Sequence, residues 1–344
     1  MTEMYIREGD FAPFVDAMIA ATRVIGPVGK RKKFVYEPLE SSSDLRLDFD
    51  VTVLPPKKVF FPPAQELVRF DGDLVEGCIA PIDTVLFGVH FYDVKGIDMT
   101  DFLFRERNAD YNYLAQREAT TIVASNIQAI SPRAFWDSVG PEVEPEGHDA
   151  FLTKLDGGYV LETRTPRGET LIAYGAFRDA TPEEVQAAAD VNASVMGRCP
   201  ERLAHSSNAI AEKVRDSFGD EKLWRELANG CFSCGSCNTV CPTCYCFDVK
   251  DTWNLDQTSG QRTRYWDSCL TREFAAVTMA GGGTENFREH HSARFRHRFM
   301  RKTTYLNEKL GGPACTGCGR CAQACTVDIA DPVKVITTIM EVTS

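Results

Sequence analysis

The pattern of apolar and polar residues divides the first 220 residues into short strand-like and helix-like segments. Runs such as Lys57–Phe61 and Asp83–Phe91, rich in β-branched and aromatic residues, are typical of strands. Residues 11–25 and 181–196 carry apolar side chains at helical spacing. The pattern therefore predicts a mixed α/β domain over residues 1–220.

Local signals refine these elements. Asp10 stands where it can cap the first helix, and Gly26-Pro27 is expected to end it. The prolines of LPPKKVFFPP confine that segment to a sheet edge or an extended loop. TRTPRGETL, with Gly168 at its tip, is predicted to be a turn between strands.

The pattern changes near residue 220. The run DEKLWRELANG is helical in character and ends at Gly230, directly before a dense group of cysteines. We place a domain boundary there and expect a second, helix-rich domain over residues 221–344. The predicted fold class is therefore α+β, with residues 1–220 as a docking domain.

Composition narrows the class of protein. A length of 344 residues suits two domains, and 43% hydrophobic with 25% charged residues is typical of a soluble globular protein. No apolar run is long enough to cross a bilayer, so we expect no membrane contact. The first residues lack the features of a signal peptide, so we expect the protein to lie in the reducing cytoplasm. The net charge of -11 argues against a nucleic-acid partner.

Eight of the 13 cysteines follow one spacing that occurs twice. The copies are Cys231-x-x-Cys234-x-x-Cys237-x-x-x-Cys241-Pro242 and Cys315-x-x-Cys318-x-x-Cys321-x-x-x-Cys325. A reducing compartment disfavours disulfides, and a zinc site usually needs only four ligands. The doubled spacing is instead typical of ferredoxins with two 4Fe-4S clusters, so we predict two such clusters here.

In two-cluster ferredoxins the fourth cysteine of each motif binds the other cluster. The expected ligands of cluster 1 are Cys231, Cys234, Cys237 and Cys325. The expected ligands of cluster 2 are Cys315, Cys318, Cys321 and Cys241. The second domain is thus expected to be a ferredoxin-like core with a long insertion at about 247–314. The second motif lacks the proline that follows Cys241, since Thr326 stands there.

Three more cysteines lie between the two motifs. Cys244, Cys246 and Cys269 are candidate ligands of a third cluster, with a fourth ligand from Cys78, Cys199 or a histidine. The alternative is that they are buried thiols packed beside the two clusters, because cysteine without a partner is among the most buried residue types.

The same insertion ends in a basic run from Arg288 to Lys302, which includes His290, His291 and His297. Positive charges beside anionic clusters raise their reduction potential, and a basic face can also dock an acidic partner. A solvated helix face is the third interpretation.

Several function classes lack their motifs. The sequence holds no G-x-G-x-x-G after a strand, no Walker A loop and no G-x-S-x-G. We therefore expect an electron carrier without a catalytic residue of its own. Two alternatives stay open: a zinc-stabilised interaction module, and a reductase that binds a flavin in its first domain.

The sequence also resembles a known family, the β subunits of cytoplasmic nickel-iron sulfhydrogenases and the related iron–sulfur subunit of anaerobic sulfite reductase. The resemblance rests on CFSCGSCNTVCPTCYCFDV, GQRTRYWDSC and RFRHRFMRKTTYLNEKLGGPACTGCGRC, and it extends to LPPKKVFFPPAQELVRF in the first half. It covers about Lys33 to Ile329. Where the family usually reads arginine-proline-cysteine-aspartate, this chain has His90 to Asp93.

The resemblance implies an electron-transfer subunit of an oxidoreductase complex. Its two clusters would connect a flavoprotein that handles NAD(P)H with a catalytic subunit, which is a nickel-iron hydrogenase in one case and a sirohaem protein in the other. The overall similarity favours the hydrogenase type.

Overall fold

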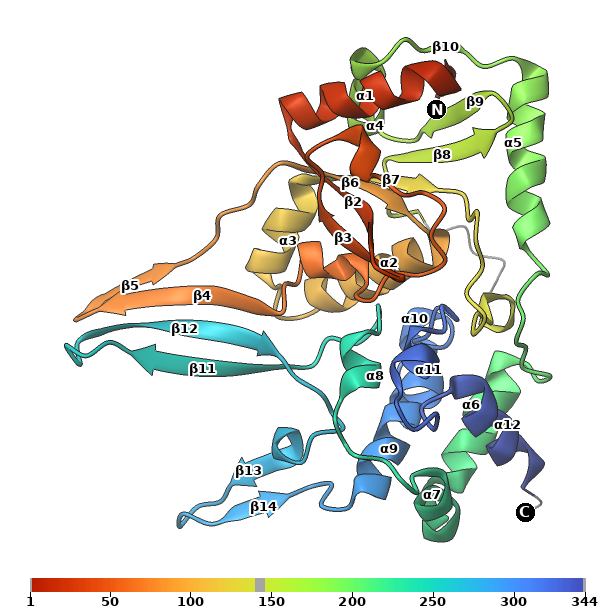
Figure 1. Cartoon of the computed structure of the whole chain (residues 1–344). Coiled ribbons are helices and arrows are strands. Elements are labelled where there is room, and N and C mark those ends of the chain that lie inside the picture. Colours follow the sequence, from red (N-terminus) through yellow and green to blue (C-terminus); the bar gives the residue numbers. More distant parts are fainter. Residues whose placement is uncertain (1, 140–145, 343–344) are drawn as a thin grey trace. The chain divides into compact units, whose positions relative to one another are not determined.

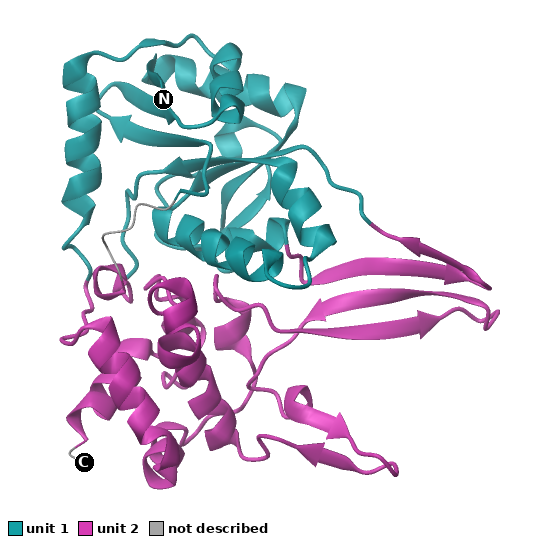
Figure 2. Ribbon diagram, turned by 180° about the vertical axis from the view of Figure 1, so that it is seen from behind, with its two compact units in different colours: residues 1–60, 79–131, 142–199 teal, residues 61–78, 132–141, 200–344 magenta. Residues whose placement is uncertain are grey.

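The structure, a computed structural model, describes residues 2–139 and 146–342 and divides into two compact units. Unit 1 comprises residues 1–60, 79–131 and 142–199, and unit 2 comprises residues 61–78, 132–141 and 200–344 (Figure 2). Each unit is built from segments that are far apart in the sequence. The division into domains at about residue 220 stays a prediction.

Unit 1 is organised around an eight-stranded sheet with the order β10-β1-β9-β8-β7-β6-β2-β3 (Figure 1). Strands β2, β6, β7 and β8 pair in parallel, and the remaining pairs are antiparallel. All six residues of β6 are buried, as expected for a central parallel strand. The strands are β1 (Thr2–Arg7), β2 (Arg23–Lys30), β3 (Lys33–Pro38), β6 (Thr84–Val89), β7 (Thr120–Ser125), β8 (Ala150–Leu155), β9 (Gly158–Thr163) and β10 (Arg178–Asp179).

Five α-helices accompany this sheet in the described part of unit 1. They are α1 (Glu8–Ala21), α2 (Phe91–Arg105), α3 (Tyr111–Glu118), α4 (Pro166–Thr170) and α5 (Pro182–Val195). The start of α5 is encoded locally, because Thr181 and Glu184 form a capping box and Pro182 occupies the first turn. The predicted helix over residues 181–196 is thereby confirmed.

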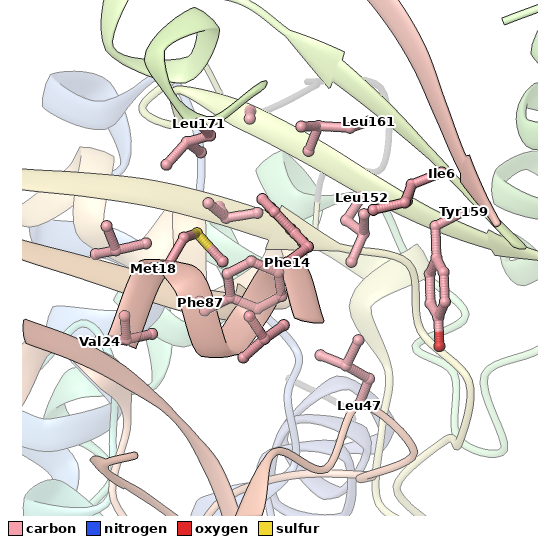
Figure 3. Close-up of a cluster of buried hydrophobic side chains, with 14 of the residues drawn as sticks. Ile6, Phe14, Met18, Val24, Leu47, Phe87, Leu152, Tyr159, Leu161 and Leu171 are labelled. Atoms are coloured by element: carbon pink, nitrogen blue, oxygen red, sulfur yellow. The ribbon is translucent and has the colours of Figure 1, made fainter. Parts of the chain in front are cut away.

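The core of unit 1 forms where α1 packs on the sheet. Figure 3 shows Phe14 and Met18 of α1 beside Phe87 of β6, with Leu152 and Leu161 of the neighbouring strands in the same cluster. The side chains of Phe14, Phe87 and Leu161 are completely buried. Burial of this apolar surface is the main stabilising contribution in unit 1.

Four local predictions for this region were wrong. The helix predicted over residues 11–25 ends at Ala21, because β-branched Val24 and Ile25 pair in strand β2. Asp10 is not the cap residue, since it lies inside the first turn and accepts a 2.8 Å hydrogen bond from Arg7 Nε. The apolar run after Pro56 forms a 3₁₀ turn, and Gly168 lies within α4.

Unit 2 contains a four-stranded antiparallel sheet with the order β11-β12-β4-β5. Its strands are β4 (Ala64–Asp71), β5 (Leu74–Gly77), β11 (Phe247–Trp253) and β12 (Ser259–Trp266). A smaller hairpin joins β13 (Ala276–Thr278) to β14 (Thr284–Asn286). The insertion between the cysteine motifs therefore forms strands, and one of them pairs with a strand from the first quarter of the chain (Figure 1).

The helices of unit 2 enclose a second core. They are α6 (Ser207–Asp216), α7 (Glu221–Leu227), α8 (Ser236–Thr239), α9 (His291–Met300), α10 (Asn307–Leu310), α11 (Arg320–Ala324) and α12 (Pro332–Glu341). Helix α9 continues into a π-helical turn at Arg301–Tyr305. Buried Trp224, Phe295 and Phe299 pack in one cluster with Cys237 and Cys321, so the apolar core extends to the cysteine motifs.

Candidate iron–sulfur centres

The two cysteine motifs have the same backbone. In each, the residue before the second cysteine and the glycine after it have positive φ: Ser233 at 55° and Gly235 at 76° in the first, Gly317 at 67° and Gly319 at 77° in the second. A short helix follows at once, α8 in the first motif and α11 in the second. Left-handed residues turn the chain sharply, which lets closely spaced thiols face one volume.

The first cavity collects cysteines from both motifs. Its lining includes Cys231, Cys234 and Cys237 of the first motif together with Cys325, the last cysteine of the second. Apolar Leu270 and Phe295 complete part of the wall. The structure thus brings together the four residues that the sequence assigned to cluster 1.

The second cavity is also lined by three cysteines of one motif and the last cysteine of the other. It is lined by Cys315, Cys318 and Cys321 of the second motif and by Cys241 of the first. These are the four residues that the sequence assigned to cluster 2.

Arg298 carries a buried positive charge beside these cysteines. Its side chain is 2% exposed, and Nε donates a 3.0 Å hydrogen bond to Asn238 Oδ1. Burial lowers the pKa of Arg298, but the nearby Cys237, Cys321, Cys244 and Cys241 thiolates together hold that pKa well above its usual value. Nη1 is buried and has no hydrogen-bond partner among the described residues. A guanidinium in this position is available to anionic sulfur.

Lys302 lies directly against the second cavity. Its Nζ donates to Cys241 Sγ at 3.2 Å and also to Thr243 Oγ1. Burial lowers the pKa of Lys302, yet the thiolates of Cys241, Cys244 and Cys315 outweigh burial and raise it above its usual value. The π-helical turn matters here, because it widens the end of α9 at the residue that carries this charge.

The buried thiols resist ionisation without such charges. Burial raises the pKa of Cys237 to about 11, and burial also raises the pKa of Cys315 and Cys321. Iron binds the thiolate, so ligand formation at these positions must overcome desolvation. The nearby cations favour the thiolate and therefore favour cluster binding.

The basic run divides between two roles. Arg294 and Arg298 are buried and Lys302 is half-buried, and they recur at every fourth position along α9 and the π-helical turn. Arg294 donates to Leu270 O at 2.8 Å and to Ser233 Oγ at 3.2 Å, which fixes the first motif. His290 and His291 are exposed, so the solvated-face interpretation applies to them.

A segment that sequence reasoning missed encloses the second motif. Phe135 N–H donates to Gly317 O at 2.8 Å, and Phe135 lines the second cavity. Arg133 pairs with Glu201 at 2.8 Å and with fully buried Asp331 at 3.3 Å. Nothing in the residue pattern of 132–139 signals this role, because the contacts are made by backbone and by residues distant in the sequence.

The remaining sequence candidates divide into two groups. Cys244, Cys246 and Cys269 line a third cavity in unit 2. Cys78 and Cys199 are not among the described residues that line the three cavities. His90, where the family motif has a different residue, is completely buried in unit 1 and stacks on Phe49 with ring centroids 3.9 Å apart.

A zinc ion and a four-iron cluster require different arrangements of the sulfur atoms that bind them. Over residues 2–139 and 146–342, no group of three or more His, Cys, Asp or Glu side chains is placed to hold a single metal ion. Sulfurs around one zinc ion lie about 3.8 Å apart, as its bond length and tetrahedral geometry require. Sulfurs around a four-iron cluster bind separate irons and surround a larger volume.

Comparison with known proteins gives the same chemistry. Residues 230–329 match the family model of a 4Fe-4S dicluster domain, so the prediction of two 4Fe-4S clusters is confirmed. The chain is 31% identical over 333 residues to sulfhydrogenase 2 subunit beta of Pyrococcus furiosus, and the alignment covers 96% of each chain. No solved structure matches the chain. Within the described residues no helix is both long and apolar enough to cross a membrane.

Proposed function

The chain belongs to the family of sulfhydrogenase β subunits, and on this premise we propose that it relays single electrons between a flavoprotein that handles NAD(P)H and a nickel-iron hydrogenase. The chemistry that four-iron clusters supply is one-electron transfer. The chain itself contributes the cysteine ligands, the buried cations and the apolar walls that set the cluster potentials. We place this activity in the cytoplasm, where the thiols stay reduced.

The observation that carries the proposal is the exchange of cysteines between the two cavities. Cys231, Cys234, Cys237 and Cys325 would hold cluster 1, and Cys315, Cys318, Cys321 and Cys241 would hold cluster 2. Each motif then supplies ligands to both clusters, which keeps them close together without a moving part. Fixed and closely spaced clusters suit an electron relay.

The partner subunits are tested by purification. A tagged copy of the chain is purified anaerobically from its own cell, and the proteins that remain bound are identified by mass spectrometry against an untagged strain. We expect a nickel-iron hydrogenase and a flavoprotein. Recovery of a sirohaem protein would assign the chain to sulfite reduction, and recovery of the chain alone would contradict a role within a complex.

A further inference from the structure

Three cysteines outside the two motif sets face one volume. Cys244, Cys246 and Cys269 line one cavity, as Cys231, Cys234, Cys237 and Cys325 line another. Cys269 is buried, and its thiol interacts with that of Cys246. The third cavity thus resembles, in its lining by several cysteines, one that the iron–sulfur motif itself forms.

The β11–β12 hairpin brings these thiols together. Cys246 directly precedes β11, and Cys269 follows soon after the end of β12. The two chain segments are joined at the base of the hairpin by a 3.0 Å hydrogen bond from Asp267 N to Cys246 O. The convergence therefore results from antiparallel pairing that the hairpin holds in register.

Asn238 connects the third cavity to the buried cations. Its Nδ2 donates to Cys269 Sγ at 3.1 Å, and its Oδ1 accepts from Cys244 Sγ at 3.7 Å and from Arg298 Nε at 3.0 Å. This amide is 1% exposed, so it orients the thiols with little competition from water.

The third cavity is lined by positively charged side chains. Arg298, Arg301 and Lys302 all line it, and its lining as described includes no Asp, Glu or His. Arg298 is buried, with Nη1 lacking a hydrogen-bond partner among the described residues. Buried cations are costly unless an anion accompanies them. Three thiolates on an iron–sulfur core supply such an anion.

We propose that Cys244, Cys246 and Cys269 hold a third iron–sulfur cluster through three cysteine ligands. Each thiol gives up its proton when it binds iron, so three protons are released as the site loads. The lining offers no fourth cysteine and no histidine, so the remaining iron position has a non-cysteine ligand or is vacant.

The test counts iron in the full chain, purified anaerobically and reconstituted with ferrous iron and sulfide. Two four-iron clusters give about eight irons per chain, and the third site raises the content to about eleven or twelve. Cys269→Ser should return the content to about eight, while the matched control Cys199→Ser, at a buried cysteine outside the three cavities, should leave it unchanged.

A second readout covers the case in which Cys269→Ser does not fold. A four-iron cluster with only three cysteines readily loses its exposed iron on mild oxidation, so wild type should show the electron paramagnetic resonance signal of a three-iron cluster, and Cys246→Ser should not. About eight irons in the wild type would overturn the proposal, as would eight irons with one zinc per chain. Neither result depends on the partner subunits, so this test is separate from that of the electron relay.

Discussion

Arg298 and Lys302 place two positive charges where thiol ligands are buried. Arg298 interacts with cysteines of all three cavities, and Lys302 contacts Cys241 directly. A cation near an iron–sulfur cluster stabilises the reduced, more negative form and raises the reduction potential. We therefore expect these residues to act through their charge on the nearby cysteines.

Replacing Lys302 by methionine removes this charge and nearly conserves the length of the side chain. We expect the potential of the cluster beside Cys241 to fall by an amount on the order of 100 mV, as Coulomb's law gives for one charge at short range and intermediate dielectric. Potentiometric titration of the reduced-cluster signal measures the shift. Lys222→Met, at an exposed position of α7, is the control, and an equal shift in both variants would contradict the account.

Asp98 in α2 gives unit 1 a pH dependence. Burial, with a smaller contribution from Asp101, raises its pKa from 3.8 to about 6. Because the folded state binds this proton more tightly than the unfolded state, Asp98 lowers the free energy of unfolding as the pH rises from about 4 to about 6. Above pH 6 the ionised Asp98 lowers the free energy of unfolding by its full amount, roughly 2–3 kcal/mol at about 1.4 kcal/mol per pKa unit.

Asp98→Asn should remove this cost and keep the shape of the side chain. We expect the variant to be more stable than wild type at pH 7.5 and the difference to shrink as the pH approaches 5. The thermal midpoints of the two proteins across this pH range measure it. A difference that is constant with pH would show that Asp98 is not the titrating group.

At the scale of elements, the turns of the cysteine motifs depend on left-handed glycines. A Cβ on Gly319 would lie 2.3 Å from the backbone oxygen of Arg133, and φ there is 77°. Gly311 has a similar φ of 66°, but a Cβ there would meet nothing within 4 Å. Comparing Gly319 with Gly311 therefore separates the cost of a left-handed backbone from the cost of a steric clash with Arg133.

Gly319→Ala should therefore destabilise far more than Gly311→Ala. The strain alone costs about 1–2 kcal/mol at either position, while the clash at Gly319 additionally displaces the segment that encloses the second motif. Thermal unfolding with iron content as a second readout measures both effects. Equal losses in the two variants would mean that the contact with Arg133 contributes nothing.

The elements that could be predicted are those with local signals. Strand β6 reads as a continuous apolar run, and α5 and α7 have caps or clear periodicity. The pairing of β4 with β12 could not be predicted, because Gln65 and Arg264 are partners only through the fold. The same holds for Phe135, whose contact with Gly317 leaves no pattern in the sequence.

For the candidate site, the cysteine spacing predicted which thiols share a cavity, since that spacing fixes a few turns of backbone. Cys246 and Cys269 come together only because of the hairpin between them, so the sequence alone could not predict that they share a cavity. The sequence also does not indicate which side of α9 faces the cysteines, because basic residues occur on every side of this helix.

At the scale of the whole molecule, the account requires crossed ligation. Cys325→Ser should weaken the cluster held mainly by the first motif and give the same spectrum as Cys234→Ser, while Cys241→Ser should match Cys318→Ser. Electron paramagnetic resonance of the reduced chain compares these pairs, with Cys78→Ser as the control. If each variant instead lost the cluster of its own motif, the ligand assignment would be wrong.

If electrons pass through this chain during turnover, freeze-quench spectroscopy of the intact anaerobic complex should detect them in its clusters. The complex is mixed with NAD(P)H, and the reduced-cluster signals of this chain are followed through the first turnover. The account predicts that these signals rise before or together with hydrogen evolution and are lost in Cys325→Ser along with that activity. Clusters that stay oxidised while hydrogen is produced at the full rate would contradict it.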